Sequence, residues 1–208
     1  MDDLKNKQSG NVSEQVILNA ARDVFMEKGM DGARMQEIAD KAGINKAMLH
    51  YYFRSKEKLF DKVFVEAFKE FWPQVQDALK IESPHEALES IVQAYIETFM
   101  EKPYLPNFIL GELHRTPEKF GLLMNEVGIQ PKVIVDFLQQ QMEMGYLKKT
   151  NPMEMMINII SMCVFPFAAR PLMIQLLMKN DEEKWNHFME GRKESIMNII
   201  KECYFIKQ

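Results

Sequence analysis

Apolar residues recur along most of this 208-residue chain at spacings of three and four, which is the period of an amphipathic α-helix. No segment alternates apolar and polar residues for long enough to predict a β-strand, and no internal repeat or low-complexity tract is found. Prolines and glycines divide the pattern at intervals that suit helix ends. The sequence therefore predicts an all-α protein. Beyond residue 83 it predicts helices near residues 84–101, 105–114, 118–126, 130–144, 153–169 and 182–206.

The amino-terminal segment divides into an arm and a helix. Residues 1–10 are polar, and we expect them to form a flexible arm. Asn11 and Glu14 have the spacing of a capping pair for a helix that runs to Lys28. Gly29 follows, and glycine commonly ends helices because it adopts a left-handed conformation without strain.

Two short helices come next, and their spacing is typical of a helix-turn-helix unit. We predict a first helix over Met35–Ala42 that ends at Gly43. Asn45 is a good N-cap for a second helix, Lys46–Tyr52, because its side chain can accept a hydrogen bond from a free backbone N–H. A further long helix begins near Ser55. In such units the second helix can lie in the DNA major groove.

Charge is distributed unevenly along the chain. The whole protein carries a formal net charge of −4, which argues against a general coat for nucleic acid. Residues 41–62, however, contain six basic and two acidic side chains. A basic patch on an acidic protein suits a DNA-binding head attached to a body with another task.

The cysteines and the apolar segments indicate a cytoplasmic protein without a membrane span. Cys163 and Cys203 have no neighbouring cysteine, so we expect neither a disulfide framework nor a zinc site. The amino terminus lacks the apolar core of a signal peptide. The most apolar stretch, Met155–Ala169, is too short to cross a bilayer.

The sequence gives little indication of a catalytic site. No H-E-x-x-H pair and no phosphate-binding glycine loop is present. Glu112 and His114 are two residues apart, which places them on different sides of a helix. We therefore expect no enzyme activity, no metal and no cofactor.

The segment from residue 34 to residue 60 contains, in order, A-G-I-N-K, L-x-Y-Y-F and S-K-E-K-L-F. This order and spacing resembles the TetR family of transcriptional regulators over roughly residues 12–62. The resemblance implies a dimeric, all-helical repressor or activator that binds an inverted-repeat operator and is released by a small ligand. We accordingly expect a DNA-binding domain at residues 11–58 and a helical ligand-binding and dimerisation domain at residues 59–208.

The resemblance also implies which side chains contact DNA. Lys46 has the charge to neutralise phosphates, and Gln36 has an amide that can make two hydrogen bonds to adenine. Met48 can contact a thymine methyl group. The implied DNA-contacting residues are Arg34, Gln36, Asn45, Lys46, Met48, His50, Tyr51, Tyr52 and Lys56.

Three departures from the usual family pattern concern four residues. Ala33 and Arg34 stand where the family commonly has a threonine pair that caps the helix and touches phosphate. Arg34 can replace the phosphate contact but not the cap. His50 stands where tyrosine is common and Ala47 where glycine is common, so the fine docking of the second helix cannot be copied from relatives.

The last predicted helix carries one apolar stripe, and this stripe has two possible structural interpretations. It either forms ordinary core or, as the resemblance implies, the face of a homodimer. Pairing has a physical motive, since a two-fold dimer doubles the contacts of one short reading helix and needs half-sites about 34–36 Å apart. The stripe consists of Trp185, Phe188, Met189, Ile196, Ile199 and Ile200.

The body is rich in methionine and phenylalanine, side chains that can line an adaptable ligand cavity. Each of them is also a normal core residue, and each polar candidate is also a normal surface group. The candidate ligand-binding residues are Tyr104, Asn107, His114, Met162 and Phe165.

The sequence therefore predicts a sequence-specific, DNA-binding transcription regulator. Repression, relieved by a small hydrophobic or amphipathic ligand, follows from the resemblance. One alternative is a ligand-independent regulator or architectural DNA-binding protein. The other is a helical ligand-binding protein or enzyme with an incidental helix-turn-helix pattern.

Overall fold

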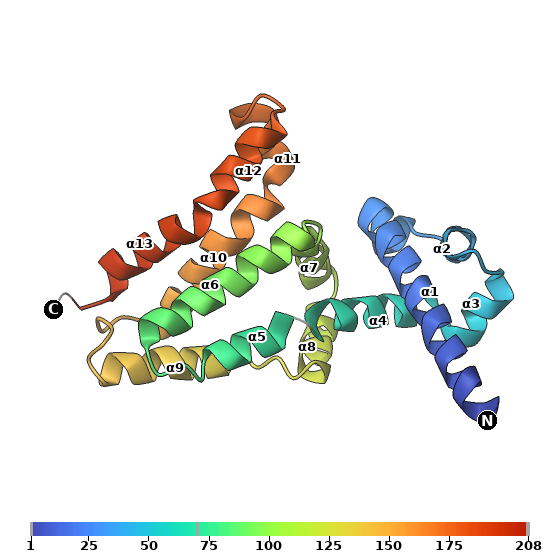
Figure 1. The fold of residues 1–208 in the computed structure, drawn as a ribbon, viewed down its shortest axis with the longest axis horizontal. Coiled ribbons are helices and arrows are strands. Elements are labelled where there is room, and N and C mark those ends of the chain that lie inside the picture. Colours follow the sequence, from blue (N-terminus) through green and yellow to red (C-terminus); the bar gives the residue numbers. More distant parts are fainter. Residues whose placement is uncertain (1, 70, 207–208) are drawn as a thin grey trace. The chain divides into compact units, whose positions relative to one another are not determined.

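The computed structural model describes residues 2–69 and 71–206, with the side chains described from Glu14 onward. The predicted arm and the predicted Asn11 cap lie outside the part with described side chains. Figure 1 shows an all-helical chain, which confirms the predicted fold class. Within the described residues the only pairing of extended backbone is an isolated bridge between Leu147 and Phe205. The helices are α1 (Asp2–Gly32), α2 (Met35–Ala42), α3 (Lys46–Tyr52), α4 (Lys56–Lys69), α5 (Phe71–Ala78), α6 (Pro84–Glu101), α7 (Leu105–Arg115), α8 (Pro117–Glu126), α9 (Lys132–Glu143), α10 (Pro152–Ala168), α11 (Arg170–Leu172), the π-helical turn η1 (Met173–Leu177), α12 (Glu182–Glu190) and α13 (Arg192–Tyr204).

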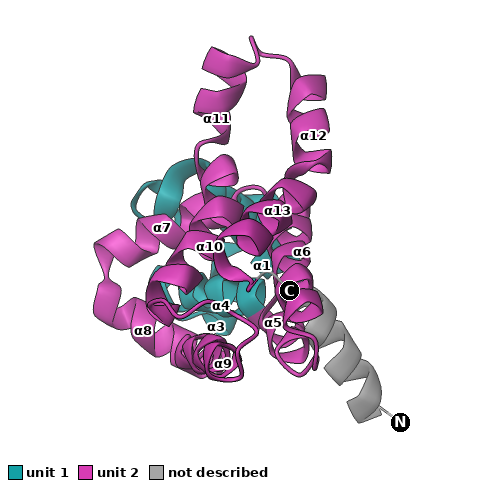
Figure 2. Cartoon of the chain, turned by 90° about the vertical axis from the view of Figure 1, so that its left-hand side faces the viewer, with its two compact units in different colours: residues 1–68 teal, residues 69–208 magenta. Residues whose placement is uncertain are grey.

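The chain divides into two compact units, residues 1–68 and 69–208 (Figure 2). Unit 1 contains α1, α2, α3 and most of α4, and unit 2 contains the remaining helices. Unit 1 extends beyond residue 58 because α4 shares its core with α1. The rings of Phe25 and Phe60, from these two helices, lie 5.0 Å apart in an edge-to-face contact.

The core of unit 1 explains why its three shorter helices need α1. The apolar positions of α1 recur at helical spacing, and Ile17, Ala21 and Phe25 are almost completely buried. Helices α1 and α2 pack against each other. The predicted break at Gly29 is present, since this residue has φ 67° and ψ 175° inside α1. One short helical turn follows the break and ends at Gly32.

In unit 2, α6 packs against α5, α10 and α13. Ser83 starts α6 by accepting a hydrogen bond from the Glu86 N–H, with 3.3 Å between the oxygen and the nitrogen. Aromatic rings fill the core beside it, and the ring centroids of Phe99 and Phe167 lie 5.4 Å apart. Burial in this core raises the pKa of the Tyr95 hydroxyl well above its usual value. The helices of unit 2 thus share one apolar interior.

The body helices up to residue 169 begin and end within two residues of the predicted positions. The prediction of one helix over residues 182–206 is wrong, because Gly191 has φ −86° and ψ −2° and separates α12 from α13. Glycine favours such breaks because it stabilises an α-helix less than any residue except proline. The sequence also missed the helical segment at residues 170–177, where α11 and η1 lie.

The apolar stripe of α12 and α13 lies mostly inside unit 2. Trp185, Met189, Ile196 and Ile200 are each at most 4% exposed, and the Trp185 ring contacts Phe167 of α10. The prediction that these four side chains face a partner subunit is therefore wrong, because they complete the core of their own unit. Helical periodicity shows which face is buried but not what covers it. Phe188 is half-buried and Ile199 is exposed.

Among the described helices, none on its own has the length and apolar character needed to cross a membrane. The bent pair formed by residues 152–168 and 170–177, with an angle of 58°, meets those two criteria jointly.

Candidate nucleic-acid interface

The turn between α2 and α3 has the predicted geometry. Helix α2 buries Ile38, Ala39 and Ala42 and ends at Gly43, which adopts the left-handed conformation with φ 69° and ψ 27°. The Ile44 N–H donates to the Ala39 carbonyl at 3.0 Å, and this bond closes the last turn of the helix. A residue with a Cβ atom would be strained at Gly43, so the glycine fixes the direction of the next helix.

Helix α3 is held at its start by the predicted cap. The side-chain oxygen of Asn45 accepts a hydrogen bond from the Met48 N–H at 2.7 Å. Leu49 is the only residue of α3 that is buried, with no exposed surface. One buried anchor leaves the rest of this two-turn helix on the surface of unit 1, as a helix that reads the major groove requires.

The nine predicted DNA-contacting residues lie on α2, on α3 or within one residue of the start of α2, α3 or α4. The Tyr51 side chain is 84% exposed and meets Tyr52 edge to face, with 5.7 Å between the ring centroids. The structure thus presents most of the set to solvent. Exposed are Arg34, Gln36, Asn45, Lys46, His50 and Tyr51, and half-buried are Met48, Tyr52 and Lys56.

Lys56, at the start of α4, has a structural role that the sequence did not reveal. Its ammonium group donates to the carbonyl oxygens of Ala33 at 3.0 Å and Asp31 at 3.3 Å. Both carbonyls belong to the junction between α1 and α2. Lys56 therefore ties α4 to this junction, and one N–H of its ammonium group is left for a phosphate contact. No local sequence signal reports a side chain that bonds to backbone more than twenty residues away.

Gln36 also has a partner within the protein. Its amide nitrogen donates to the Asp40 carboxylate at 2.7 Å, one helical turn away on α2. An amide that makes two hydrogen bonds to adenine must present both its nitrogen and its oxygen. Because the amide nitrogen carries two N–H donors, Gln36 can keep its bond to Asp40 while its other N–H and its oxygen contact adenine.

Arg34 caps α2 only with its backbone, because its side chain makes no cap hydrogen bond. The acidic side chain of Glu37 lies in the first turn, where it suits the positive end of the helix dipole. Lys28 of α1 lies 3.0 Å from the Glu37 carboxylate, and this hydrogen bond is the main reason that the pKa of Glu37 is lowered. A second ion pair joins Lys41 to Asp23 at 3.1 Å. These two pairs orient α2 on α1.

The five predicted ligand-binding residues lie on or beside α7 and α10, which pack against each other. Asn107 and His114 are exposed, and so is Phe165, at 64%. Tyr104 and Met162 are half-buried. None of the five lines the pocket of unit 2 described below.

The geometry of α2, the Gly43 turn and α3 defines a helix-turn-helix unit. Comparison with known proteins agrees with this assignment. Residues 17–63 match the family model of bacterial regulatory proteins of the tetR family. The helix-turn-helix domain is therefore that of the TetR family of regulators, and the match is to the amino-terminal part of the chain.

Two characterised relatives are similar to part of the chain. The HTH-type transcriptional regulator RutR of Escherichia coli strain K12 is 29% identical over 134 residues, which cover 64% of this chain and 61% of RutR. The HTH-type transcriptional repressor NicS of Pseudomonas putida is 32% identical over 111 residues, which cover 52% of each chain. The chain thus spans less than two thirds of the length of these relatives.

Solved structures share the fold over a larger part of the chain. HlyIIR, a hemolysin II transcriptional regulator, superposes with a TM-score of 0.66 and 23% identity, over 81% of this chain and 94% of HlyIIR. The ketosteroid transcriptional regulator KstR2 of Mycobacterium tuberculosis gives a TM-score of 0.64 with 23% identity, over 74% of this chain and 81% of KstR2. At 23% identity, the similarity to these two structures shows a shared fold and nothing further.

Proposed function

We propose that this protein is a sequence-specific, DNA-binding transcription regulator that acts as a repressor and leaves DNA when a small hydrophobic or amphipathic ligand binds. The observation that carries the proposal is the construction of α3. A side-chain cap fixes its start, one buried leucine anchors it, and its remaining side chains form an exposed or half-exposed surface. In this proposal residues 11–58 bind DNA, and residues 59–208 bind the ligand and a second subunit.

Six of the nine predicted DNA-contacting residues have one of three roles under this proposal. Asn45 and Lys56 position the helices, since their side chains are bonded to backbone groups of unit 1. Lys46 and Arg34, both exposed, neutralise phosphates. Base reading falls to side chains that reach the major groove, of which Gln36 and Met48 have suitable chemistry.

We propose a homodimer that binds an inverted repeat, with the contact made by an exposed apolar stripe on α10. Met153, Ile157 and Phe165 are 59%, 52% and 64% exposed, and their spacing of four and eight residues places them on one face of the helix. Ile199 of the neighbouring α13 is 42% exposed. This stripe replaces the buried residues of α12 and α13 as the proposed interface.

Ligand release requires that the ligand favour one conformation of the dimer over another. A ligand that prefers recognition helices spaced wrongly for successive major grooves weakens DNA binding by the same differential free energy. Tyr104, Asn107, His114 and Met162 stay candidates for such a site between α7 and α10. Phe165, which is largely exposed, is better placed for the dimer contact.

The proposal is tested by selection from randomised duplex DNA at near-physiological salt, with the bound fraction recovered over several rounds and sequenced. The expected result is an enriched inverted repeat with half-sites about one helical turn, roughly 34–36 Å, apart. If a folded dimer, freed of any co-purified ligand, enriches no sequence, the proposal of sequence-specific binding is wrong.

A further inference from the structure

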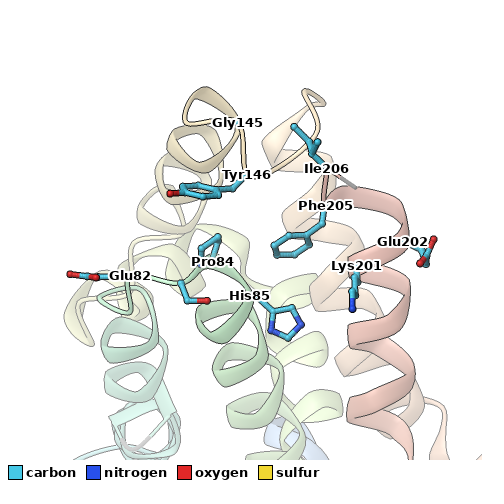
Figure 3. A pocket seen from close by; sticks show the side chains of 10 residues that line it. Glu82, Pro84, His85, Gly145, Tyr146, Lys201, Glu202, Phe205 and Ile206 are labelled. Atoms are coloured by element: carbon cyan, nitrogen blue, oxygen red, sulfur yellow. The ribbon is translucent and has the colours of Figure 1, made fainter. Parts of the chain in front are cut away.

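Unit 2 contains a pocket of about 850 Å³ that the sequence did not predict (Figure 3). Three chain segments distant in sequence form it: the start of α6, the turn after α9 and the end of α13. Its volume falls within the range of about 300–1,000 Å³ that is usual for sites binding small molecules. The lining residues are Glu82, Ser83, Pro84, His85, Gly145, Tyr146, Lys201, Glu202, Phe205 and Ile206.

Backbone hydrogen bonds fix the walls of the pocket. Gly145 turns the chain with φ 81°, a value that favours glycine. The Ile206 N–H donates to the Tyr146 carbonyl at 3.3 Å, and the Lys148 N–H donates to the Tyr204 carbonyl at 2.7 Å. The end of α13 is therefore fastened to the turn after α9.

One side of the pocket is apolar and aromatic. The rings of Tyr146 and Phe205 line it together with Pro84 and Ile206 (Figure 3). The Phe205 ring meets the His85 ring edge to face, with 5.8 Å between the centroids. Such surfaces accept a flat apolar molecule, because aromatic faces give a large contact area at little entropic cost.

The charged side chains that line the pocket point in different directions. Figure 3 shows the carboxylates of Glu82 and Glu202 pointing outward, away from the other lining side chains, while Lys201 and His85 lie next to each other below the Phe205 ring. Lys201 forms no ion pair with any residue that the structure describes. The pocket therefore offers positive charge beside its apolar wall.

The charged groups beside the pocket, Glu89 and Lys148, have further partners of their own. Glu89 lies 4.0 Å from the His85 ring, but its other carboxylate oxygen contacts the Lys193 ammonium at 2.8 Å. That hydrogen bond from Lys193 is the main reason that the pKa of Glu89 is lowered. Lys148 directs its ammonium group to the backbone carbonyls of Glu202 and Cys203 at the end of α13. The ammonium group of Lys201 is therefore available to contact a ligand.

We infer that this pocket binds a small amphipathic organic anion, a carboxylate or sulfonate with a flat apolar body. Lys201, with His85 beside it, contacts the anionic group, and Tyr146 and Phe205 enclose the body. All ten lining residues belong to unit 2, so binding does not require DNA. Only the further role of such a ligand as the releasing effector rests on the proposed function.

The test uses two fluorescent probes that differ by one sulfonate group, the anion 1-anilinonaphthalene-8-sulfonate and neutral N-phenyl-1-naphthylamine. Each is titrated into the full-length protein. We expect one saturable site per chain for the anionic probe. Lys201→Gln should weaken its binding about fivefold, in the range of a partly exposed charge interaction, and leave the neutral probe unchanged. Lys201→Arg should retain the affinity.

Two further variants complete the test. Lys132→Gln removes an exposed lysine of α9 that does not line the pocket, so it should bind both probes as the wild type does. Tyr146→Ala should weaken both probes, since it removes apolar wall. Equal binding of the anionic probe by wild type and Lys201→Gln would overturn the inference, as would the lack of any saturable site. Selection of DNA sequences is a separate experiment. Ligand binding by the pocket and sequence-specific DNA binding can therefore each be refuted while the other stands.

Discussion

The ammonium group of Lys56 donates a hydrogen bond to the carbonyl oxygen of Ala33 at a distance of 3.0 Å. Through this bond, and a longer one to Asp31, the first residue of α4 holds the junction that leads from α1 into α2. Carbonyl groups at helix ends lack partners within the helix, so a lysine that reaches them stabilises the junction. The position of α2, and with it of α3, depends on this contact.

Lys56→Ala should therefore lower the free energy of unfolding by about 1 kcal/mol, the usual net value of a hydrogen bond, and also weaken DNA binding. Urea denaturation measures the first effect. Lys58→Ala is the matched control, because Lys58 lies on the same helix and is exposed. If both variants unfold at the same urea concentration, the structural role of Lys56 is refuted.

Gln36→Ala should relax the preference at one base pair of each half-site, by about 1–3 kcal/mol if the amide reads adenine with two bonds. Binding to a panel of operators with single substitutions measures this preference. Asp40→Ala provides a companion variant, since it removes the carboxylate that holds the Gln36 amide and, with it, a negative charge that repels phosphate, so it should strengthen overall binding. An unchanged base preference in Gln36→Ala would end the assignment of this residue as a base reader.

The double variant Ile157→Asp with Phe165→Asp should convert the dimer to a monomer, because it places two charges in the exposed stripe of α10. Sedimentation analysis should then give half the wild-type mass. Leu122→Asp is the control, since Leu122 is 70% exposed on α8 and lies outside the stripe. A double variant that keeps the wild-type mass would place the interface elsewhere.

The two cysteines should differ in reactivity at pH 8. Burial raises the pKa of the Cys163 thiol to about 12, so the reactive thiolate is scarce at pH 8, whereas Cys203 is exposed. A chromogenic disulfide reagent should label one thiol per chain rapidly and the second only after unfolding in urea. Rapid labelling of both thiols in the folded protein would contradict the buried position of Cys163.

The sequence predicted the boundaries of α2 and α3 because local chemistry sets them. Gly43 supplies a left-handed turn and Asn45 a cap, and both act within four residues of their position in the chain. Helices of unit 2 that begin with proline were predicted for the same reason.

Features that depend on distant segments could not be predicted in this way. The stripe that includes Trp185 and Ile200 has the correct period, but periodicity does not distinguish the core of one subunit from a dimer face. The Lys56 bonds join positions more than twenty residues apart, and the pocket lined by Tyr146 and Lys201 joins three remote segments. These contacts arise from tertiary packing.

One binding measurement tests whether the exposed surface of α3 reads DNA. The triple variant Lys46→Ala, His50→Ala, Tyr51→Ala changes three exposed side chains and leaves buried Leu49 and the Asn45 cap intact. Fluorescence anisotropy with the selected operator at near-physiological salt compares it with wild type and with Lys132→Ala. At about 1 kcal/mol for each contact, the triple variant should bind at least about a hundredfold more weakly, with a smaller dependence on salt. If it stays folded and binds the operator as tightly as Lys132→Ala, α3 is not the DNA-reading helix.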